Sequence, residues 1–192
     1  MKKFELTTEF ITNAFGKKLF RIKALVEFGD VKAGELGGYV EKEGNVSQAD
    51  NAWVYGDARV YGDARVSGNA RVYGDARVSG NAWVYGDARV SGNARVSGNA
   101  WVSGNARVYG DARVYGDADY ALVQGFGTEF RCTTFYSGKN KKIMVNCGCF
   151  HGDLEGFRKQ VKETRNGKIA KEYLMIADLM EYHFTSEDSS NE

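Results

Sequence analysis

The stretch that decides the fold begins Ala52-Trp53-Val54-Tyr55-Gly56-Asp57 and ends Ala112-Arg113-Val114-Tyr115-Gly116-Asp117. It consists of eleven six-residue units without insertion or deletion, each reading Ala, Arg or Trp, Val, Tyr or Ser, Gly, Asp or Asn. A fixed short period predicts one structural unit stacked on itself. Ala and Val share one side of an extended strand, and Gly followed by Asp or Asn favours a bend. The stretch therefore predicts a coil of very short strands with an Ala/Val interior.

An aliphatic residue followed four positions later by a small one, every six residues, resembles the bacterial hexapeptide-repeat family. The resemblance implies a mainly β protein, a left-handed parallel β-helix with three units per coil. One departure is that the family often places Gly directly after the aliphatic residue, whereas here Gly comes one position later. The family's acyltransferases use a His base and protruding loops, and its zinc hydratases use three His ligands. Residues 52–117 contain neither His nor an inserted loop, so the sequence disfavours a hexapeptide-repeat acyltransferase and we expect no enzyme.

Three units per coil would align every third unit in one outward-facing column. The third column would hold Arg65, Trp83 and Trp101, with Tyr85 beside Trp83. Stacked exposed Trp is unusual, and Trp and Arg are enriched where partners bind, although simple shielding of the rod explains the same residues. The first column would hold Trp53, Arg71, Arg89 and Arg107, and the second Arg59, Arg77, Arg95 and Arg113.

The Arg columns also raise the hypothesis that the protein binds nucleic acid or sequesters a nucleotide. The repeats carry eight Arg against six Asp, and the whole chain carries 26 basic and 25 acidic residues. This balance argues against a strong grip on DNA, and a solvated face whose Arg residues stack on Tyr and pair with Asp is the simpler interpretation.

The flanking segments predict caps for the two ends of the coil. Residues 1–35 are expected to form a β-hairpin that covers the first coil, because an open edge would aggregate. The coil is expected to span residues 36–124, with two extra residues near 48–51 and a degraded twelfth unit starting at Ala118. Residues 125–184 predict a ββαα module whose first helix is capped by Asp153. The acidic tail, 185–192, is expected to be disordered.

Cysteine and histidine cluster in this C-terminal module. Cys147, Cys149 and His151 alternate, so in a strand they would share one face, with Cys132 on the partner strand. Such a group could form a Cys₃His zinc site, or a thiol with His151 as its base. Cysteine is also common in protein cores, and alternate residues of a strand suit a metal less well than a Cys-x-x-Cys turn.

Three cysteines, an odd number clustered late in the chain, favour a reducing cytoplasm over a disulfide scaffold. The start, Met1-Lys2-Lys3-Phe4-Glu5, lacks the apolar core of a signal peptide, and no apolar run approaches a membrane span. We therefore expect a cytoplasmic protein without a membrane partner, and homo-oligomers are compatible with the sequence.

The order of hairpin, repeats and Asn146-Cys147-Gly148-Cys149-Phe150 resembles small proteins carried by bacteriophages and prophages. That resemblance implies no activity residue by residue. It does suggest a non-enzymatic β-helical protein that docks a host protein or complex, with inhibition of a host antiviral system as a specific form.

Overall fold

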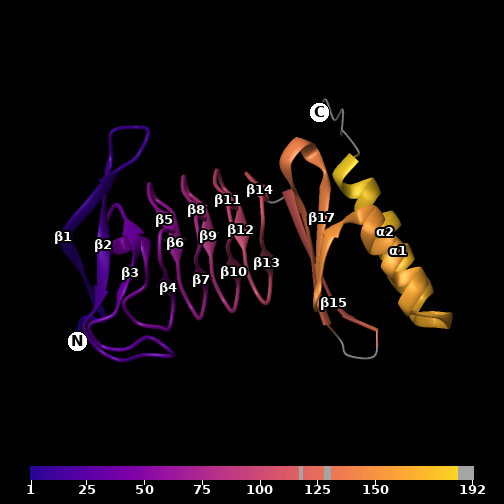
Figure 1. Ribbon diagram of the computed structural model, residues 1–192, viewed down its shortest axis with the longest axis horizontal. Coiled ribbons are helices and arrows are strands. Elements are labelled where there is room, and N and C mark those ends of the chain that lie inside the picture. Colours follow the sequence, from indigo (N-terminus) through magenta and orange to yellow (C-terminus); the bar gives the residue numbers. More distant parts are fainter. Residues whose placement is uncertain (117–118, 128–130, 186–192) are drawn as a thin grey trace, which may run out of the picture.

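The computed structural model describes residues 1–116, 119–127 and 131–185. Its centre is a three-sided parallel β-solenoid, with an N-terminal hairpin at one end and a sheet with two helices at the other (Figure 1). The eleven repeat strands are two residues long, each beginning at the Arg or Trp of its unit. They are β4 (Trp53–Val54), β5 (Arg59–Val60), β6 (Arg65–Val66), β7 (Arg71–Val72), β8 (Arg77–Val78), β9 (Trp83–Val84), β10 (Arg89–Val90), β11 (Arg95–Val96), β12 (Trp101–Val102), β13 (Arg107–Val108) and β14 (Arg113–Val114).

Every third strand pairs in parallel, which confirms three units per coil. The first face is β4-β7-β10-β13, the second contains β5-β8-β11-β14, and the third is β6-β9-β12. Residues 18 apart are directly opposite, as in Arg89 against Arg71 and Trp101 against Trp83. Each unit donates backbone N–H groups to the next coil, for example from Arg71 to the Ala88 carbonyl at 2.9 Å and from Tyr73 to Val90 at 3.0 Å.

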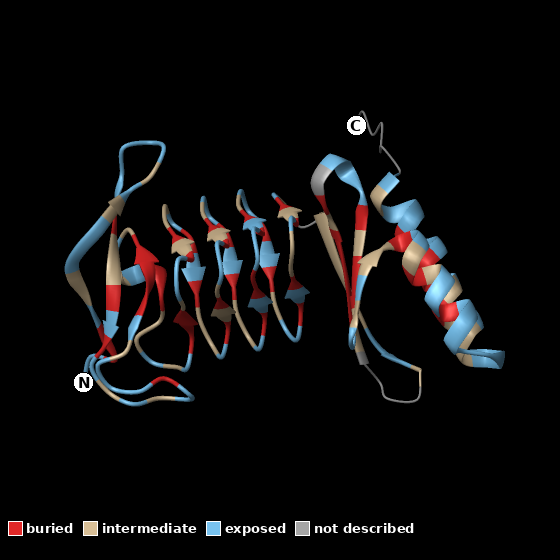
Figure 2. Ribbon diagram, in the orientation of Figure 1, coloured by how far each residue is buried: buried red, intermediate tan, exposed pale blue. Residues whose placement is uncertain are grey.

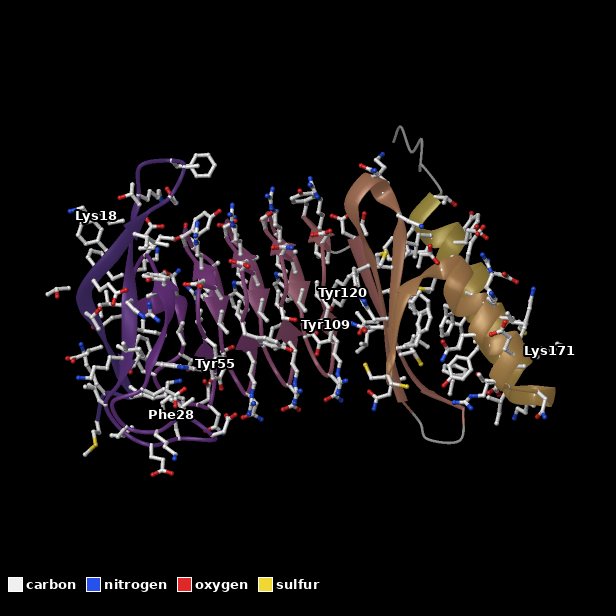
Figure 3. All side chains as sticks on the ribbon, in the orientation of Figure 1. Lys18, Phe28, Tyr55, Tyr109, Tyr120 and Lys171 are labelled. Atoms are coloured by element: carbon white, nitrogen blue, oxygen red, sulfur yellow. The ribbon has the colours of Figure 1, made fainter. Side chains whose placement is uncertain are left out.

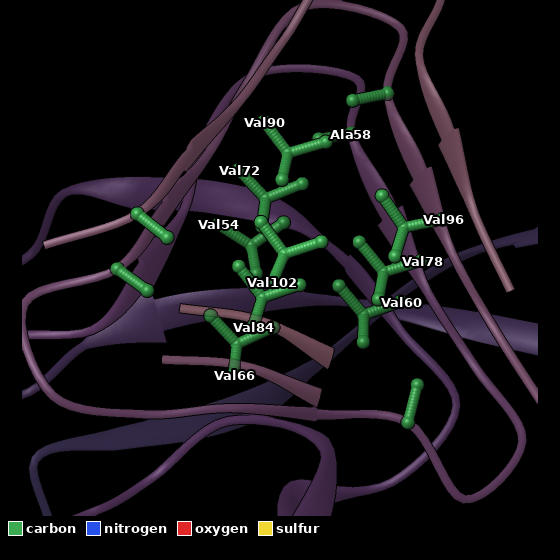
Figure 4. Packing of buried hydrophobic residues seen from close by; sticks show 14 of the residues in the cluster. Val54, Ala58, Val60, Val66, Val72, Val78, Val84, Val90, Val96 and Val102 are labelled. Atoms are coloured by element: carbon green, nitrogen blue, oxygen red, sulfur yellow. The ribbon is translucent and has the colours of Figure 1, made fainter. Parts of the chain in front are cut away.

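The interior is made of the Ala and Val side chains alone. Every repeat Ala and Val is at most 1 % exposed. Figure 4 shows the valines in rows, such as Val54, Val72 and Val90, stacked one coil above another. Such a narrow, filled interior leaves no space for a ligand inside the solenoid.

The turns that follow β4 to β13 each place a glycine at positive φ. Gly68, for example, has a φ of +67°, a left-handed conformation that costs other residues energy. A Cβ on Gly68 would also lie 2.9 Å from the backbone N of Gly86 in the next coil. The displaced glycine of this sequence is therefore the residue that lets the corners of adjacent coils stack.

The N-terminal hairpin closes the first coil, as the sequence predicts. Strands β1 (Phe4–Thr12) and β2 (Lys18–Ala24) pair antiparallel, and β2 pairs with β3 (Leu36–Val40), which in turn pairs in parallel with β5. A 3₁₀ turn follows at Glu43–Asn45. The hairpin and β3 therefore join the solenoid's second face as one continuous sheet of seven strands.

Three different donors replace the coil that is missing at this end. Within the solenoid, each Ala carbonyl accepts a backbone N–H from the preceding coil. In the first coil, Ala52 accepts from Lys3 Nζ at 2.9 Å, Ala58 from the Tyr39 N–H at 2.9 Å, and Ala64 from Asn45 Nδ2 at 2.8 Å. Buried carbonyls left without donors would be costly, so these contacts are how the cap stabilises the rod.

Trp53 corrects the expectation that all Arg and Trp positions face solvent. It is fully buried, because its ring contacts Phe28 at 5.3 Å and Phe4 at 5.8 Å between ring centroids. Trp53 begins the first strand of its column, so the terminal segment, rather than another coil, lies against it. Its role is to anchor the cap.

The C-terminal module has four antiparallel strands where the sequence predicts two. They are β15 (Tyr120–Phe126), β16 (Arg131–Ser137), β17 (Ile143–Cys147) and β18 (Phe150–Asp153), followed by α1 (Leu154–Thr164) and α2 (Gly167–Thr185). Residues 120–124, predicted as part of a degraded twelfth unit, instead belong to β15, which pairs with β16. Asp153 caps α1 through the Gly156 N–H at 2.7 Å, as predicted. Thr185, predicted to begin the disordered tail, instead ends α2. Residues 186–192 of that tail and Ala118 of the predicted twelfth unit lie outside the described residues.

This module closes the last coil with side chains. The Arg107 N–H, which in earlier coils would donate to an Ala carbonyl, donates to Thr134 Oγ1 at 3.0 Å. The Arg107 carbonyl accepts from Asn146 Nδ2 at 3.0 Å. Tyr136 is fully buried and extends the solenoid core. Both ends of the rod are therefore covered, which removes the open edges that would otherwise template aggregation.

Candidate interaction surface

The third face carries a ladder of Arg65, Trp83 and Trp101. The two indole rings are stacked, with centroids 5.4 Å apart and planes at 10°, and the Arg65 guanidinium lies over the Trp83 ring at 5.3 Å. Trp83 is 38 % and Trp101 49 % exposed. The structure thus brings together the predicted Trp pair and Arg65, which was predicted in the same column.

The coil geometry produces this stack directly. Trp83 and Trp101 are opposite each other in parallel strands, and their neighbours Val84 and Val102 point into the core. Adjacent strands lie about 4.8 Å apart, close to the preferred separation of offset aromatic rings. Stacking along the rod turns one face of each ring toward the other, and both rings remain partly exposed.

Tyr85 lies in the same unit as Trp83 and is half-buried. Its backbone N–H donates to the Val102 carbonyl at 3.0 Å, which fixes its strand against the coil that carries Trp101. The third face is therefore a rigid surface with the Trp pair exposed and Tyr85 partly covered beside it.

The second face carries the predicted Arg column. Arg59, Arg77, Arg95 and Arg113 are directly opposite one another in successive coils. A small surface cavity of about 110 Å³ lies between Asn93, Arg95, Asp111 and Arg113. Corner carboxylates such as Asp111 therefore lie beside the guanidinium groups and offset their positive charge.

The first face holds polar contacts that the sequence does not reveal. Asp30, from the segment after the hairpin, accepts hydrogen bonds from Arg71 at 2.8 Å and from Tyr55 at 3.2 Å. Burial raises the pKa of Tyr55 to about 12. An open cavity of about 300 Å³ lies between these residues, Tyr73 and Arg89. The column pattern predicts the Arg and Tyr residues of this face, but nothing in the spacing indicates Asp30.

Tyr73 and Tyr109 cover the rest of this face. Their rings contact edge to face at 6.4 Å between centroids. Ser91, whose unit lies between theirs in the column, is buried. Burial, together with a hydrogen bond to Tyr73, raises the pKa of Tyr109 to about 12. Ser in this position thus makes room for two larger neighbours.

The predicted alignment of Cys147, Cys149 and His151 on one strand face is wrong. The chain turns back at Gly148, where φ is +60°, so Cys147 ends β17 and His151 lies on the returning strand β18. The Cys147 sulfur accepts from Thr133 Oγ1 at 3.1 Å, and the Cys132 thiol donates to the Asn105 carbonyl at 3.5 Å. His151 Nε2 instead lies 3.0 Å from the Tyr136 hydroxyl.

These four residues therefore do not converge. Over residues 1–116, 119–127 and 131–185, no three His, Cys, Asp or Glu side chains are grouped closely enough to hold a metal ion. Burial raises the pKa of the Cys132 thiol, which disfavours the thiolate that nucleophilic chemistry needs. Within the same described ranges, no helix is long and apolar enough to cross a membrane.

A family model matches the solenoid itself. The repeats match the YdcK Beta solenoid repeat. The matched stretches are residues 52–68, 58–73, 64–78, 70–86, 88–104 and 106–118. A search of curated proteins gave no match to this chain. The comparison therefore agrees with the beta-solenoid, while the family match does not extend to the hairpin or the C-terminal module.

Proposed function

We propose that the protein is a non-enzymatic binding protein whose third face contacts a protein partner. The observation that carries the proposal is the exposed Trp83–Trp101 stack with Arg65 over its end. Trp and Arg dominate the energetics of protein interfaces, particularly when held rigidly before binding. Backbone hydrogen bonds from Trp83 to the Ala100 carbonyl and from Tyr85 to the Val102 carbonyl fix the register of the two strands without a partner.

The geometry of the stack favours a protein over a nucleic acid at this face. Proteins that bind single-stranded nucleic acid let the bases stack on the open faces of aromatic side chains. Here the Trp83 face toward Trp101 is occupied by that ring, and Arg65 lies over Trp83. Both faces of Trp83 are therefore covered, which leaves no open face of that ring for a base and favours contacts with side chains. The formal net charge of +1 adds no general attraction for nucleic acid.

The identity of the partner follows from the resemblance of the whole chain to phage and prophage proteins. We propose that it is a host protein or protein complex, and that binding inhibits a host antiviral system. A rigid rod with closed ends suits this role because it displays a fixed surface at little entropic cost on binding.

The Arg column on the second face supports a second candidate, the binding of a nucleotide or nucleic acid. Arg95 and Arg113 lie at neighbouring levels beside a cavity of about 110 Å³, which is near the size of a phosphate group rather than a whole nucleotide. This candidate predicts salt-dependent binding to immobilised phosphate or DNA.

Affinity purification from cells that carry the phage or prophage tests the first candidate. We compare wild type, the double variant Trp83→Ser/Trp101→Ser, and the control Tyr115→Ser, which removes another exposed repeat aromatic. The double variant should fold but lose its partner, with affinity falling at least about 30-fold, whereas the control should retain it. Retention of the partner by the double variant, or recovery of nucleotides in place of protein, would overturn the proposal.

A further inference from the structure

The N-terminal segment covers only part of the solenoid's first face. Along this face Trp53 of β4 is buried, Arg71 of β7 is half-buried and Arg89 of β10 is exposed. Figure 2 shows the same decrease in burial from β4 to β10. The open cavity of about 300 Å³ on this face lies where the cover ends. It is lined by Asp30, Tyr55, Arg71, Tyr73 and Arg89.

The cavity lies beside two aromatic side chains of one column. Tyr55 and Tyr73 occupy adjacent coils, as the two stacked Trp residues do on the third face. Tyr73, however, contacts Tyr109, two coils further along the rod, at 6.4 Å between ring centroids. Two coils separate the backbones by about 9.6 Å, so these rings lean toward each other across the buried Ser91. Figure 3 shows Tyr55 and Tyr109 well apart along the rod. The lean of Tyr73 leaves space beside Tyr55, which the cavity occupies.

The two guanidinium groups at the cavity differ in how they are satisfied. Asp30 accepts hydrogen bonds from Arg71 at 2.8 Å and from the Tyr55 hydroxyl at 3.2 Å, so its carboxylate balances one positive charge. Arg89 lies opposite Arg71 in the adjacent strand. Within residues 1–116, 119–127 and 131–185, the Arg89 guanidinium forms no ion pair and no hydrogen bond. The residues that line the cavity therefore carry one positive charge in excess.

These features define the chemical class of a ligand. Guanidinium groups bind carboxylates through paired N–H donors, and one carboxylate matches one excess positive charge. The rings of Tyr55 and Tyr73 offer flat apolar walls, against which an aromatic ring packs favourably. A volume of about 300 Å³ lies at the lower end of small-molecule pockets and suits one ring or two fused rings. Because burial raises the pKa of Tyr55 to about 12, its phenol adds no negative charge near neutral pH.

We propose that the first face binds a small aromatic monocarboxylate. Arg89 and the remaining N–H donors of Arg71 hold the carboxylate, and Tyr55 and Tyr73 contact the ring. Asp30 is a positioning residue, because it fixes Arg71 from the side of the N-terminal segment. The site shares no residue with the Trp ladder of the third face, so it goes beyond the proposed contact with a protein partner.

Isothermal titration calorimetry of the full chain tests the ligand class with indole-3-acetate, 2-naphthoate and benzoate. At least one should bind, and its amide should bind about tenfold more weakly because the amide carries no charge. Cyclohexylacetate, which has a carboxylate but no aromatic ring, should also bind more weakly. Absence of binding by all three acids up to about 10 mM, or equal binding of acid and amide, would overturn the proposal. Tighter binding of adenosine monophosphate would overturn the carboxylate as the recognised group.

Two variants and a matched control test the location. Arg89→Gln should weaken binding about tenfold, whereas Arg107→Gln, an exposed position of the same column outside the cavity, should change it by at most about twofold. Ser91→Tyr introduces the residue that six units carry at this position. It should turn Tyr73 back toward Tyr55 and abolish binding, with the circular dichroism spectrum unchanged.

Equal weakening by Arg89→Gln and Arg107→Gln, or full binding by a folded Ser91→Tyr chain, would place the ligand elsewhere and overturn the site. The probes are small molecules and need no host partner. Failure of this proposal is therefore distinguishable from failure of the third-face contact, which is measured by recovery of a protein.

Discussion

Removing repeat units in different numbers gives opposite outcomes for the Trp ladder. Deletion of residues 88–93 takes out one unit of the first face, so every later unit moves back by one face, from the second to the first and from the third to the second. Trp101 then lies in the column of Arg59 and Arg77, and Trp83 has an Arg above it. Deletion of residues 58–75 removes three units, one whole coil. Trp83 and Trp101 then remain in adjacent coils of the third face.

Both deletions should fold, because each retains the contacts of the N-terminal cap and of the C-terminal module with identical or nearly identical repeat units. Removing 18 residues should shorten the rod by about 4.8 Å. The six-residue deletion loses the stacking of the two Trp rings, which contributes about 0.5–1.5 kcal/mol of stability, together with one buried Ala and one buried Val. The longer deletion costs three times as much core yet preserves the pair.

Exciton coupling between the stacked indoles, observed by far-ultraviolet circular dichroism, distinguishes the two chains. The coupling should survive the 18-residue deletion, disappear in the six-residue deletion, and disappear in the full-length control Trp83→Phe. Survival of the coupling after the six-residue deletion would refute the assignment of three units to each coil.

Three further predictions concern the turns and the N-terminal cap. Gly56→Ala should lower the free energy of unfolding, measured in urea, by about 1–2 kcal/mol, because its φ is +58°. Gly68→Ala should lower it more, because only at Gly68 does the new Cβ also press against backbone of the next coil. Equal losses would contradict the tight stacking of corners. Asn45→Ala should cost about 1–3 kcal/mol because it removes the donor from the buried Ala64 carbonyl and from the partly buried Gly62 carbonyl. Asn99→Ala, at an exposed corner, should change stability by at most about 0.5 kcal/mol. Burial lowers the pKa of Lys3 from 10.5 to about 8, so between these pH values the unfolded chain binds more protons than the folded one. The stability of wild type relative to Lys3→Met should therefore rise with pH in this range, as measured by urea unfolding at several pH values. A fall with pH would show that the folded cap favours the ammonium form.

The solenoid can be predicted from sequence because each unit repeats the same local instructions. Ala and Val at one spacing define the interior, and Gly at a fixed place defines the turn. Once three units form a coil, the position of every outer side chain follows from counting. The Trp83–Trp101 stack and the Arg columns could therefore be predicted before any coordinates, and the pairings confirm their positions.

Repeat position does not predict the surroundings of a side chain where its neighbours lie outside the repeats. Trp53 occupies an outward position, but it is covered by Phe4 and Phe28, which are distant in sequence. Likewise Asn146 to Phe150 has the alternation of one strand, whereas the positive φ of Gly148 creates a tight turn that separates Cys147 from His151. Gly148 is the only local signal of that turn.

Spin labels at the corners test the three-unit coil most directly. Asp75 and Asn93 are 18 residues apart and occupy the same corner of adjacent coils, whereas Asp75 and Asp87 are 12 apart and occupy different corners. With the native cysteines replaced by Ser, labels at 75 and 93 should lie on backbones about 4.8 Å apart and show strong dipolar broadening. Labels at 75 and 87 should show none. Broadening from the 12-residue pair, or its absence from the 18-residue pair, would contradict the solenoid and with it the stacked Trp surface.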